Sequence, residues 1–72
     1  MKTFTVETNY DVYNISFTKG KMILTDSNCN YVTHGYFRIM MIFARERILS
    51  FQQWDEYGNC TFEYTSARKM YA

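Results

Sequence analysis

The chain has 72 residues, with eight Lys and Arg against seven Asp and Glu and a formal net charge of +1. A chain of this length forms one domain, and the balanced, well-mixed charge excludes a polybasic nucleic-acid-binding protein and an acidic mimic of DNA. Seven Tyr, six Phe, one Trp and five Met give it an unusual aromatic mass, and Pro is absent. We expect one small domain over residues 1–66 and a C-terminal tail over residues 67–72.

The first half of the chain predicts antiparallel strands. Residues 2–8 and 12–18 each alternate between apolar and polar side chains, which is the period of a half-buried strand. The pair Lys19-Gly20 then gives a short turn, after which residues 22–24 open a third strand. Two β-rich runs joined by a Gly-containing pair are typical of a β-hairpin.

The middle of the chain is compatible with two structures. Residues 36–54 contain no Gly, Pro, Asn or Asp, and residues 44–47 have high helix propensity, so one long helix is an alternative. In a helical projection, however, the apolar side chains do not gather on one side. Alternation therefore favours two strands, over residues 36–43 and 48–54, with an irregular corner between them.

The end of the chain predicts a second hairpin. Residues 48–54 lead into a loop over residues 55–59, and residues 60–66 alternate again. The predicted fold class is all-β, a small antiparallel sheet or partly closed barrel of five to six strands. The alternative is an α+β fold in which residues 36–54 are helical against an antiparallel sheet.

No segment carries a catalytic, metal-binding or nucleotide-binding motif. His34 is the only histidine, and Cys29 and Cys60 are the only cysteines, which is too few ligands for a structural zinc site. We expect both cysteines to be free, buried thiols. Asp55 and Glu56 are adjacent carboxylates, but in a hairpin loop we expect them to be solvent-facing charges rather than an acid–base pair. The sequence therefore predicts a protein that is not an enzyme and needs no cofactor and no metal.

The sequence also predicts a cytoplasmic location without membrane contact. No signal-peptide pattern opens the chain, and the longest apolar run, residues 39–44, is far too short to span a bilayer. In the cytoplasm the two thiols are expected to stay reduced.

The tyrosines predict a surface for a partner protein. Seven Tyr cannot all be buried in so small a core, because each buried hydroxyl needs a hydrogen-bond partner. Trp, Tyr and Arg are also the residues enriched at binding hot spots. A homodimer is a further expectation, because small chains often gain stability by self-association. The candidate partner-binding residues are Tyr36, Arg38, Arg45, Arg47, Trp54 and Tyr57.

The composition suggests what the partner is, although no motif assigns the chain to a family. Tyr, Phe, Asn, Ile, Lys and Met, whose codons are AT-rich, dominate the chain. In this it resembles the small accessory and early proteins of bacteriophages and other mobile elements. The resemblance implies an inhibitor that blocks a host or defence protein by direct binding in the host cell cytoplasm.

The alternative function is a small β-barrel that binds single-stranded nucleic acid or a nucleotide. Such proteins stack bases on aromatic side chains beside a positively charged groove. Arg38, Arg45 and Arg47 with the aromatic residues near them offer such a platform. The net charge of only +1 argues against it, because phosphate contacts normally supply most of the affinity.

Overall fold

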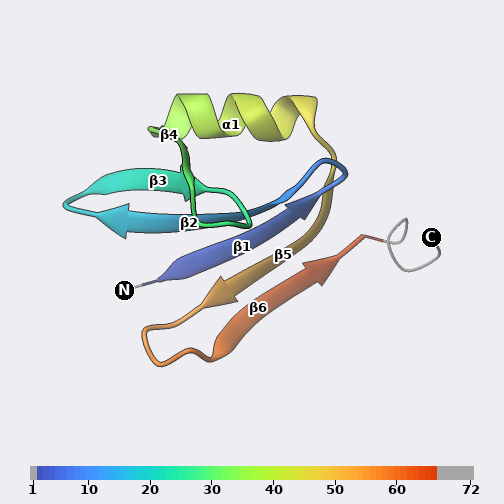
Figure 1. Cartoon of the computed structure of the whole chain (residues 1–72). Coiled ribbons are helices and arrows are strands. Elements are labelled where there is room, and N and C mark those ends of the chain that lie inside the picture. Colours follow the sequence, from blue (N-terminus) through green and yellow to red (C-terminus); the bar gives the residue numbers. More distant parts are fainter. Residues whose placement is uncertain (1, 67–72) are drawn as a thin grey trace.

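A computed structural model describes residues 2–66, which form one open antiparallel sheet and one helix (Figure 1). The strand order is β4-β3-β2-β1-β5-β6, so β4 and β6 are the outer edges and the sheet is not closed into a barrel. The predicted small antiparallel sheet is thereby confirmed. The elements in chain order are β1 (Thr3–Thr8), β2 (Val12–Thr18), β3 (Lys21–Thr25), β4 (Tyr31–His34), α1 (Tyr36–Arg45), β5 (Ile48–Trp54) and β6 (Cys60–Thr65).

The predicted turn between β2 and β3 is confirmed. Lys19 and Gly20 both have positive φ, 53° and 76°, and Thr18 pairs with Lys21 across them. Two consecutive residues with positive φ are the pattern of a type I′ turn, whose twist matches that of the strands it joins. The local sequence is therefore sufficient to set this hairpin.

The strand predicted over residues 36–43 was wrong, because the helix α1 occupies Tyr36–Arg45. The helical alternative holds for this part of the chain only, since Ile48–Trp54 is the strand β5. The periodicity of the sequence did not identify the helix, because α1 carries apolar side chains on two sides. Ile39 is completely buried against the sheet, whereas Phe37 and Met41 are 82% and 63% exposed.

The start of α1 is fixed by the backbone of Gly35. This residue has φ 95° and ψ 142°, a conformation outside the helical region, and no side chain caps the helix. Its N–H donates to the carbonyl oxygen of Met22 at 2.9 Å, and its own carbonyl accepts from the N–H of Ile39 at 3.1 Å. The first turn of the helix is thereby tied to β3.

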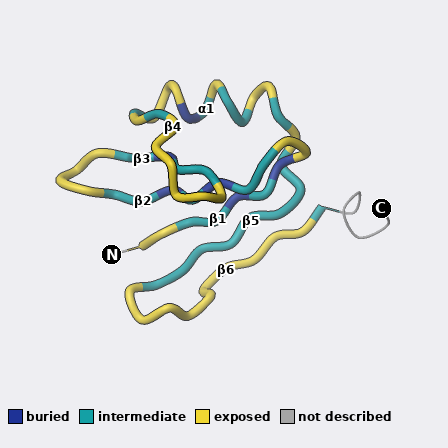
Figure 2. Tube along the Cα trace, viewed as in Figure 1, coloured by how far each residue is buried: buried dark blue, intermediate teal, exposed yellow. Residues whose placement is uncertain are grey.

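The core lies between α1 and the half of the sheet beneath it (Figure 2). Val6 pairs with Tyr13, and Ile15 pairs with Leu24, so these side chains share one face of the sheet. Ile39 closes the core from the helix. Exposure increases toward β6, in which all six residues are exposed.

The opposite face of the sheet is largely polar. Thr5 pairs with Asn14 on one side and with Gln52 on the other. Its hydroxyl donates to Asn14 Oδ1 at 3.2 Å and accepts from Trp54 Nε1 at 3.0 Å. Alternation along the strands therefore separates an apolar face from a hydrogen-bonded polar face.

Cys29 and Cys60 are free but exposed, so the prediction of buried thiols was wrong. Cys29 lies in the β3–β4 loop with φ 64°, and Cys60 opens the edge strand, so neither position is covered by the core.

Within residues 2–66 no helix is long and apolar enough to cross a membrane. The predicted tail, residues 67–72, lies outside the described residues.

Candidate functional site

The outer side of α1 and the neighbouring strand β4 carry a group of large side chains that the fold leaves uncovered. Phe37 is 82% exposed, and Met41 and Tyr36 are more than half exposed. Scattered apolar residues on a surface are ordinary, but a contiguous group of them marks a site of interaction. We call this group the helix-outer surface; it comprises Val32, Tyr36, Phe37, Arg38, Met41 and Arg45.

The helical spacing brings these side chains together. Phe37, Met41 and Arg45 follow one another at intervals of four residues, which places them in a row along one side of the helix. Arg38 and Arg45 both line a groove of about 260 Å³ between α1 and β4, together with Val32, Met41, Ile42 and the polar Thr33. An apolar groove bordered by two arginines is therefore open to solvent.

An aromatic pair stands at the start of the helix-outer surface. The rings of Tyr36 and Phe37 have centroids 5.9 Å apart and planes at 81°, an edge-to-face arrangement. This geometry is favourable for two aromatic rings and restrains their rotamers. The pair therefore presents an ordered apolar surface rather than two independent side chains.

The arginines of the helix-outer surface have no carboxylate within that surface. The nearest acidic residue along the helix, Glu46, is engaged elsewhere. The hydroxyl of Thr8 donates to one oxygen of this carboxylate at 2.7 Å. The hydroxyl of Tyr13 donates to the same carboxylate and lies 3.0 Å from each of its two oxygens. The helix-outer surface is therefore positively charged as well as apolar.

Of the six predicted residues, the structure brings together Arg38 and Arg45, which line one groove. Tyr36 lies in the first turn of the same helix, where its ring contacts that of Phe37. Arg47 follows the helix, and its backbone N–H donates to Asn9 Oδ1 at 2.8 Å. Trp54 lies on the polar face of the sheet with its indole N–H bonded to Thr5. Tyr57 is in the β5–β6 turn, which Figure 1 shows far from α1.

Phe37 and Met41 were not among the residues predicted for the site. In a strand over residues 36–43 both side chains would lie on the same face as Ile39 and Phe43 and would be expected in the core. The signal that was present is the spacing of four residues between Phe37, Met41 and Arg45. It becomes readable only once the segment is known to be helical.

Comparison with known protein families, with curated proteins and with solved structures finds no match for this chain. The function is therefore inferred from the side chains and their arrangement alone.

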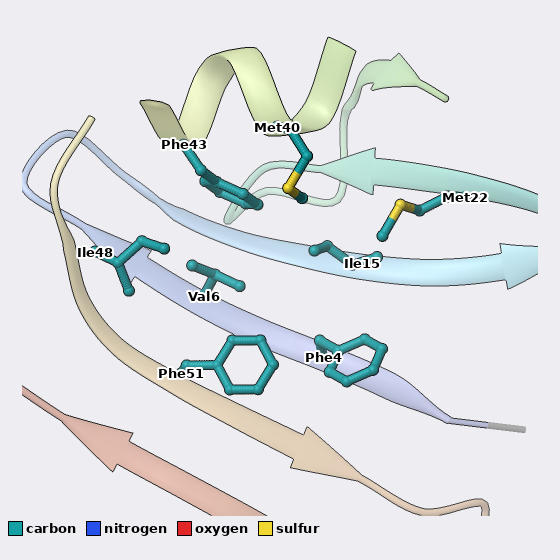
Figure 3. A pocket seen from close by; sticks show the side chains of 8 residues that line it. All are labelled: Phe4, Val6, Ile15, Met22, Met40, Phe43, Ile48 and Phe51. Carbon is teal, nitrogen blue, oxygen red and sulfur yellow. The ribbon is translucent and has the colours of Figure 1, made fainter. Parts of the chain in front are cut away.

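A second apolar surface lies on the α1 side of the sheet, beyond the end of the helix. We call it the open sheet face; it consists of Ile48, Phe51, Phe62 and Tyr64, which line a groove of about 400 Å³. Two of its members, Ile48 and Phe51, also line a cavity of about 250 Å³ between α1 and the sheet (Figure 3). The groove and the cavity are therefore parts of one apolar surface.

His34 and Asp55 are engaged in local structure. His34 Nδ1 is hydrogen-bonded to the hydroxyl of Tyr31. The Asp55 carboxylate accepts the backbone N–H of Asn59 and of Tyr57, each at 2.9 Å, and these bonds hold the pKa of Asp55 below its usual value. Among residues 2–66 there is no group of three or more His, Cys, Asp or Glu arranged to hold a metal ion. Asp55 therefore acts as the hydrogen-bonding anchor of the β5–β6 turn.

Proposed function

We propose that this chain is a small non-enzymatic protein that binds another protein through the helix-outer surface. The observation that carries the proposal is the exposure of Phe37 and Met41 on α1, where Met41 also lines a groove together with Arg38 and Arg45. Aromatic residues and arginine are enriched at binding hot spots, and exposed apolar groups of this kind are typical of interaction sites. Burial of these side chains under a partner removes apolar area from water and so favours association.

The chemistry of the helix-outer surface defines the segment that fits it. An apolar side chain of the partner fills the groove beside Val32 and Met41. Carboxylates on either side of that side chain pair with Arg38 and Arg45, because guanidinium and carboxylate groups form strong charge-assisted hydrogen bonds. The proposed ligand is therefore an acidic segment with at least one large apolar residue.

We further propose that the chain is a phage or mobile-element inhibitor that blocks a host or defence protein in the host cytoplasm. The support is the predominance of residues whose codons are AT-rich, together with a surface that can block a target without any catalytic group. Occupying a functional site of the target with a rigid aromatic and cationic surface is sufficient for inhibition.

Nucleic-acid binding is the competing function, and one observation favours it. The exposed Tyr36–Phe37 pair beside Arg38 is also a suitable platform for stacking a base. The two functions differ in their dependence on salt, because phosphate contacts release counterions and weaken steeply as salt increases.

The test is capture from host lysate by the tagged full chain, with and without nuclease and along a salt gradient. The proposal predicts a stoichiometric protein band that survives nuclease. The band is lost with the Arg38→Glu, Arg45→Glu double variant, which places two carboxylates against the acidic segment.

The matched control is the Lys19→Glu, Lys21→Glu double variant, which changes the net charge equally but lies at the β2–β3 turn. It should retain the band. Material that disappears with nuclease would replace the proposal with nucleic-acid binding. Equal capture by both double variants would remove the helix-outer surface from the function.

A further inference from the structure

The side of the sheet that carries α1 is only half covered. The helix packs over Val6, Ile15 and Leu24, which are fully buried or nearly so. In β5, Phe51 pairs with Val6 on one side and with Tyr64 on the other, so the open sheet face continues the same side of the sheet. The helix does not cover β6, in which Phe62 is 55% and Tyr64 is 49% exposed (Figure 2).

The open sheet face is continuous with the space under the helix. Phe51 contacts Phe4 with ring centroids 5.4 Å apart and Phe62 with ring centroids 6.0 Å apart. In Figure 3, Phe4 and Phe51 lie on the sheet side of the cavity, facing Met40 and Phe43 of α1. An unbroken aromatic surface therefore runs from beneath the helix to the edge strand.

The open sheet face contains no charged side chain. Every residue that lines its groove and the cavity is apolar or aromatic, with the Tyr64 hydroxyl as the one polar side-chain group among them. Gln53, which pairs with Phe4 and with Phe62, adds an uncharged amide on the same side of the sheet. The open sheet face differs in its lack of charge from the helix-outer surface, whose arginines select an acidic partner. A surface without charge is complementary to another uncharged apolar surface, and a second copy of the chain supplies one.

We infer that the open sheet face is the interface of a homodimer in which β5 and β6 of one copy cover β5 and β6 of the other. A helix is about 10 Å thick and two stacked sheets are about 10 Å apart. A partner's β5–β6 hairpin therefore fits beside α1 in the same layer, on the part of the sheet that α1 leaves bare.

The position of α1 selects the symmetry of this dimer. A two-fold axis along the strands places each β6 beside the helix of the other copy. With a two-fold axis across the strands, each helix would instead overlap with the sheet of the partner. The allowed arrangement is isologous and closed, and it shields the edge strand β6, whose unpaired backbone groups are otherwise open to aggregation.

The interface is small. Strands of six and seven residues are about 20 Å long, and two such pairs packed face to face bury on the order of 1,000 Å² in total. Stable, specific interfaces bury about 1,200–2,000 Å², and smaller ones are typical of weak or transient association. We therefore expect a weak, reversible dimer.

The test is sedimentation equilibrium of the purified full chain from about 1 to 500 µM, a range wide enough to detect the weak dimer expected of a small interface. The wild type should change from monomer to dimer within this range. Tyr64→Glu places a carboxylate in the interface and should raise the dissociation constant at least tenfold. Because Tyr64 is half exposed on an edge strand, circular dichroism should remain that of the folded wild type.

The matched control is Thr65→Glu, which adds the same charge one residue along β6. Thr65 pairs with Ser50 on the polar face, so dimerisation should be retained. A dimer weakened equally by both substitutions would indicate edge-to-edge pairing of β6 and overturn the inference. A chain that stays monomeric at 500 µM, or that carries an apolar molecule by native mass spectrometry, overturns it as well. Tyr64→Glu should leave capture by the helix-outer surface unchanged, so the two proposals fail separately.

Discussion

Among single residues, Tyr13 shows most clearly how the fold fixes the end of α1. Its ring is 5% exposed, and its hydroxyl donates to both oxygens of Glu46, the residue at which the helix ends. Thr8 donates a third hydrogen bond to the same carboxylate. Burial first, and then the hydrogen bond and charge of Glu46, raise the pKa of Tyr13 to about 12. One carboxylate therefore ties β1, β2 and α1 together.

This pKa predicts a loss of stability at alkaline pH. In the unfolded chain Tyr13 ionises near its ordinary pKa of about 10, whereas in the folded chain it stays protonated up to about pH 12. The contribution of Tyr13 to the free energy of unfolding is therefore complete below pH 10. It is lost as the pH rises from 10 to 12, a decrease on the order of 2 kcal/mol. Urea unfolding at pH 9 and pH 11.5 measures it.

Tyr13→Phe is the control for this prediction. The variant should be less stable at pH 9 by about 1.5–3 kcal/mol, because a buried hydrogen bond to a charged group is lost. Its free energy of unfolding should then fall less between the two pH values than that of the wild type. Parallel pH dependence in the two proteins would show that Tyr13 is not the group responsible.

At the level of elements, the placement of α1 depends on Gly35. Its φ of 95° lies in a region that side chains rarely adopt, although a Cβ there would meet no atom within 4 Å. Gly35→Ala should therefore act through backbone strain, at a cost of about 1–3 kcal/mol. The strain lies between β3 and the first turn of the helix, so we expect weaker partner capture as well as a lower melting temperature.

Gly58→Ala separates these two effects. Gly58 has φ 83° and also has space for a Cβ, but it lies in the β5–β6 turn. This variant should lose stability while keeping the wild-type affinity for the partner. An affinity that is lowered equally in both glycine variants would mean that partner binding follows global stability rather than the position of α1.

The elements differ in how far the sequence predicts them. The two hairpins are local, because alternation and the Lys19-Gly20 turn determine them within a few residues. The helix is not local, since its apolar residues serve both the core and the helix-outer surface and so blur its period. Its end at Glu46 depends on Tyr13, a contact that spans 33 residues.

The candidate site was predictable to the extent that it lies on one element. Arg38 and Arg45 come together because they are seven residues apart on α1 and line one groove, whereas Tyr36 shares the helix but contacts Phe37 at its start. Trp54 was placed with them by residue type, but its register with Thr3 and its bond to Thr5 assign it to the other face of the sheet. A shift of one residue in register exchanges the two faces of a strand, so residue type alone does not place Trp54 on a face.

At the scale of the whole molecule, the two proposed interfaces lie toward opposite edges of the sheet. The helix-outer surface borders β4, whereas the open sheet face spans β5 and β6. A dimer through the open sheet face therefore leaves both helix-outer surfaces accessible. Two binding surfaces on one particle increase the apparent affinity for a multivalent target without any new contact.

The measurement that tests the central claim most directly is the affinity of the captured partner for wild type, Phe37→Ala and Tyr10→Ala. Phe37 and Tyr10 are aromatic residues with the same exposure of 82%, but only Phe37 belongs to the helix-outer surface. We predict that Phe37→Ala raises the dissociation constant by about 30-fold or more, as expected for a hot spot of about 2 kcal/mol. Tyr10→Ala should leave it within about twofold of the wild-type value, in keeping with a residue outside any hot spot. Equal affinities of the two variants would contradict the proposal that α1 carries the binding surface.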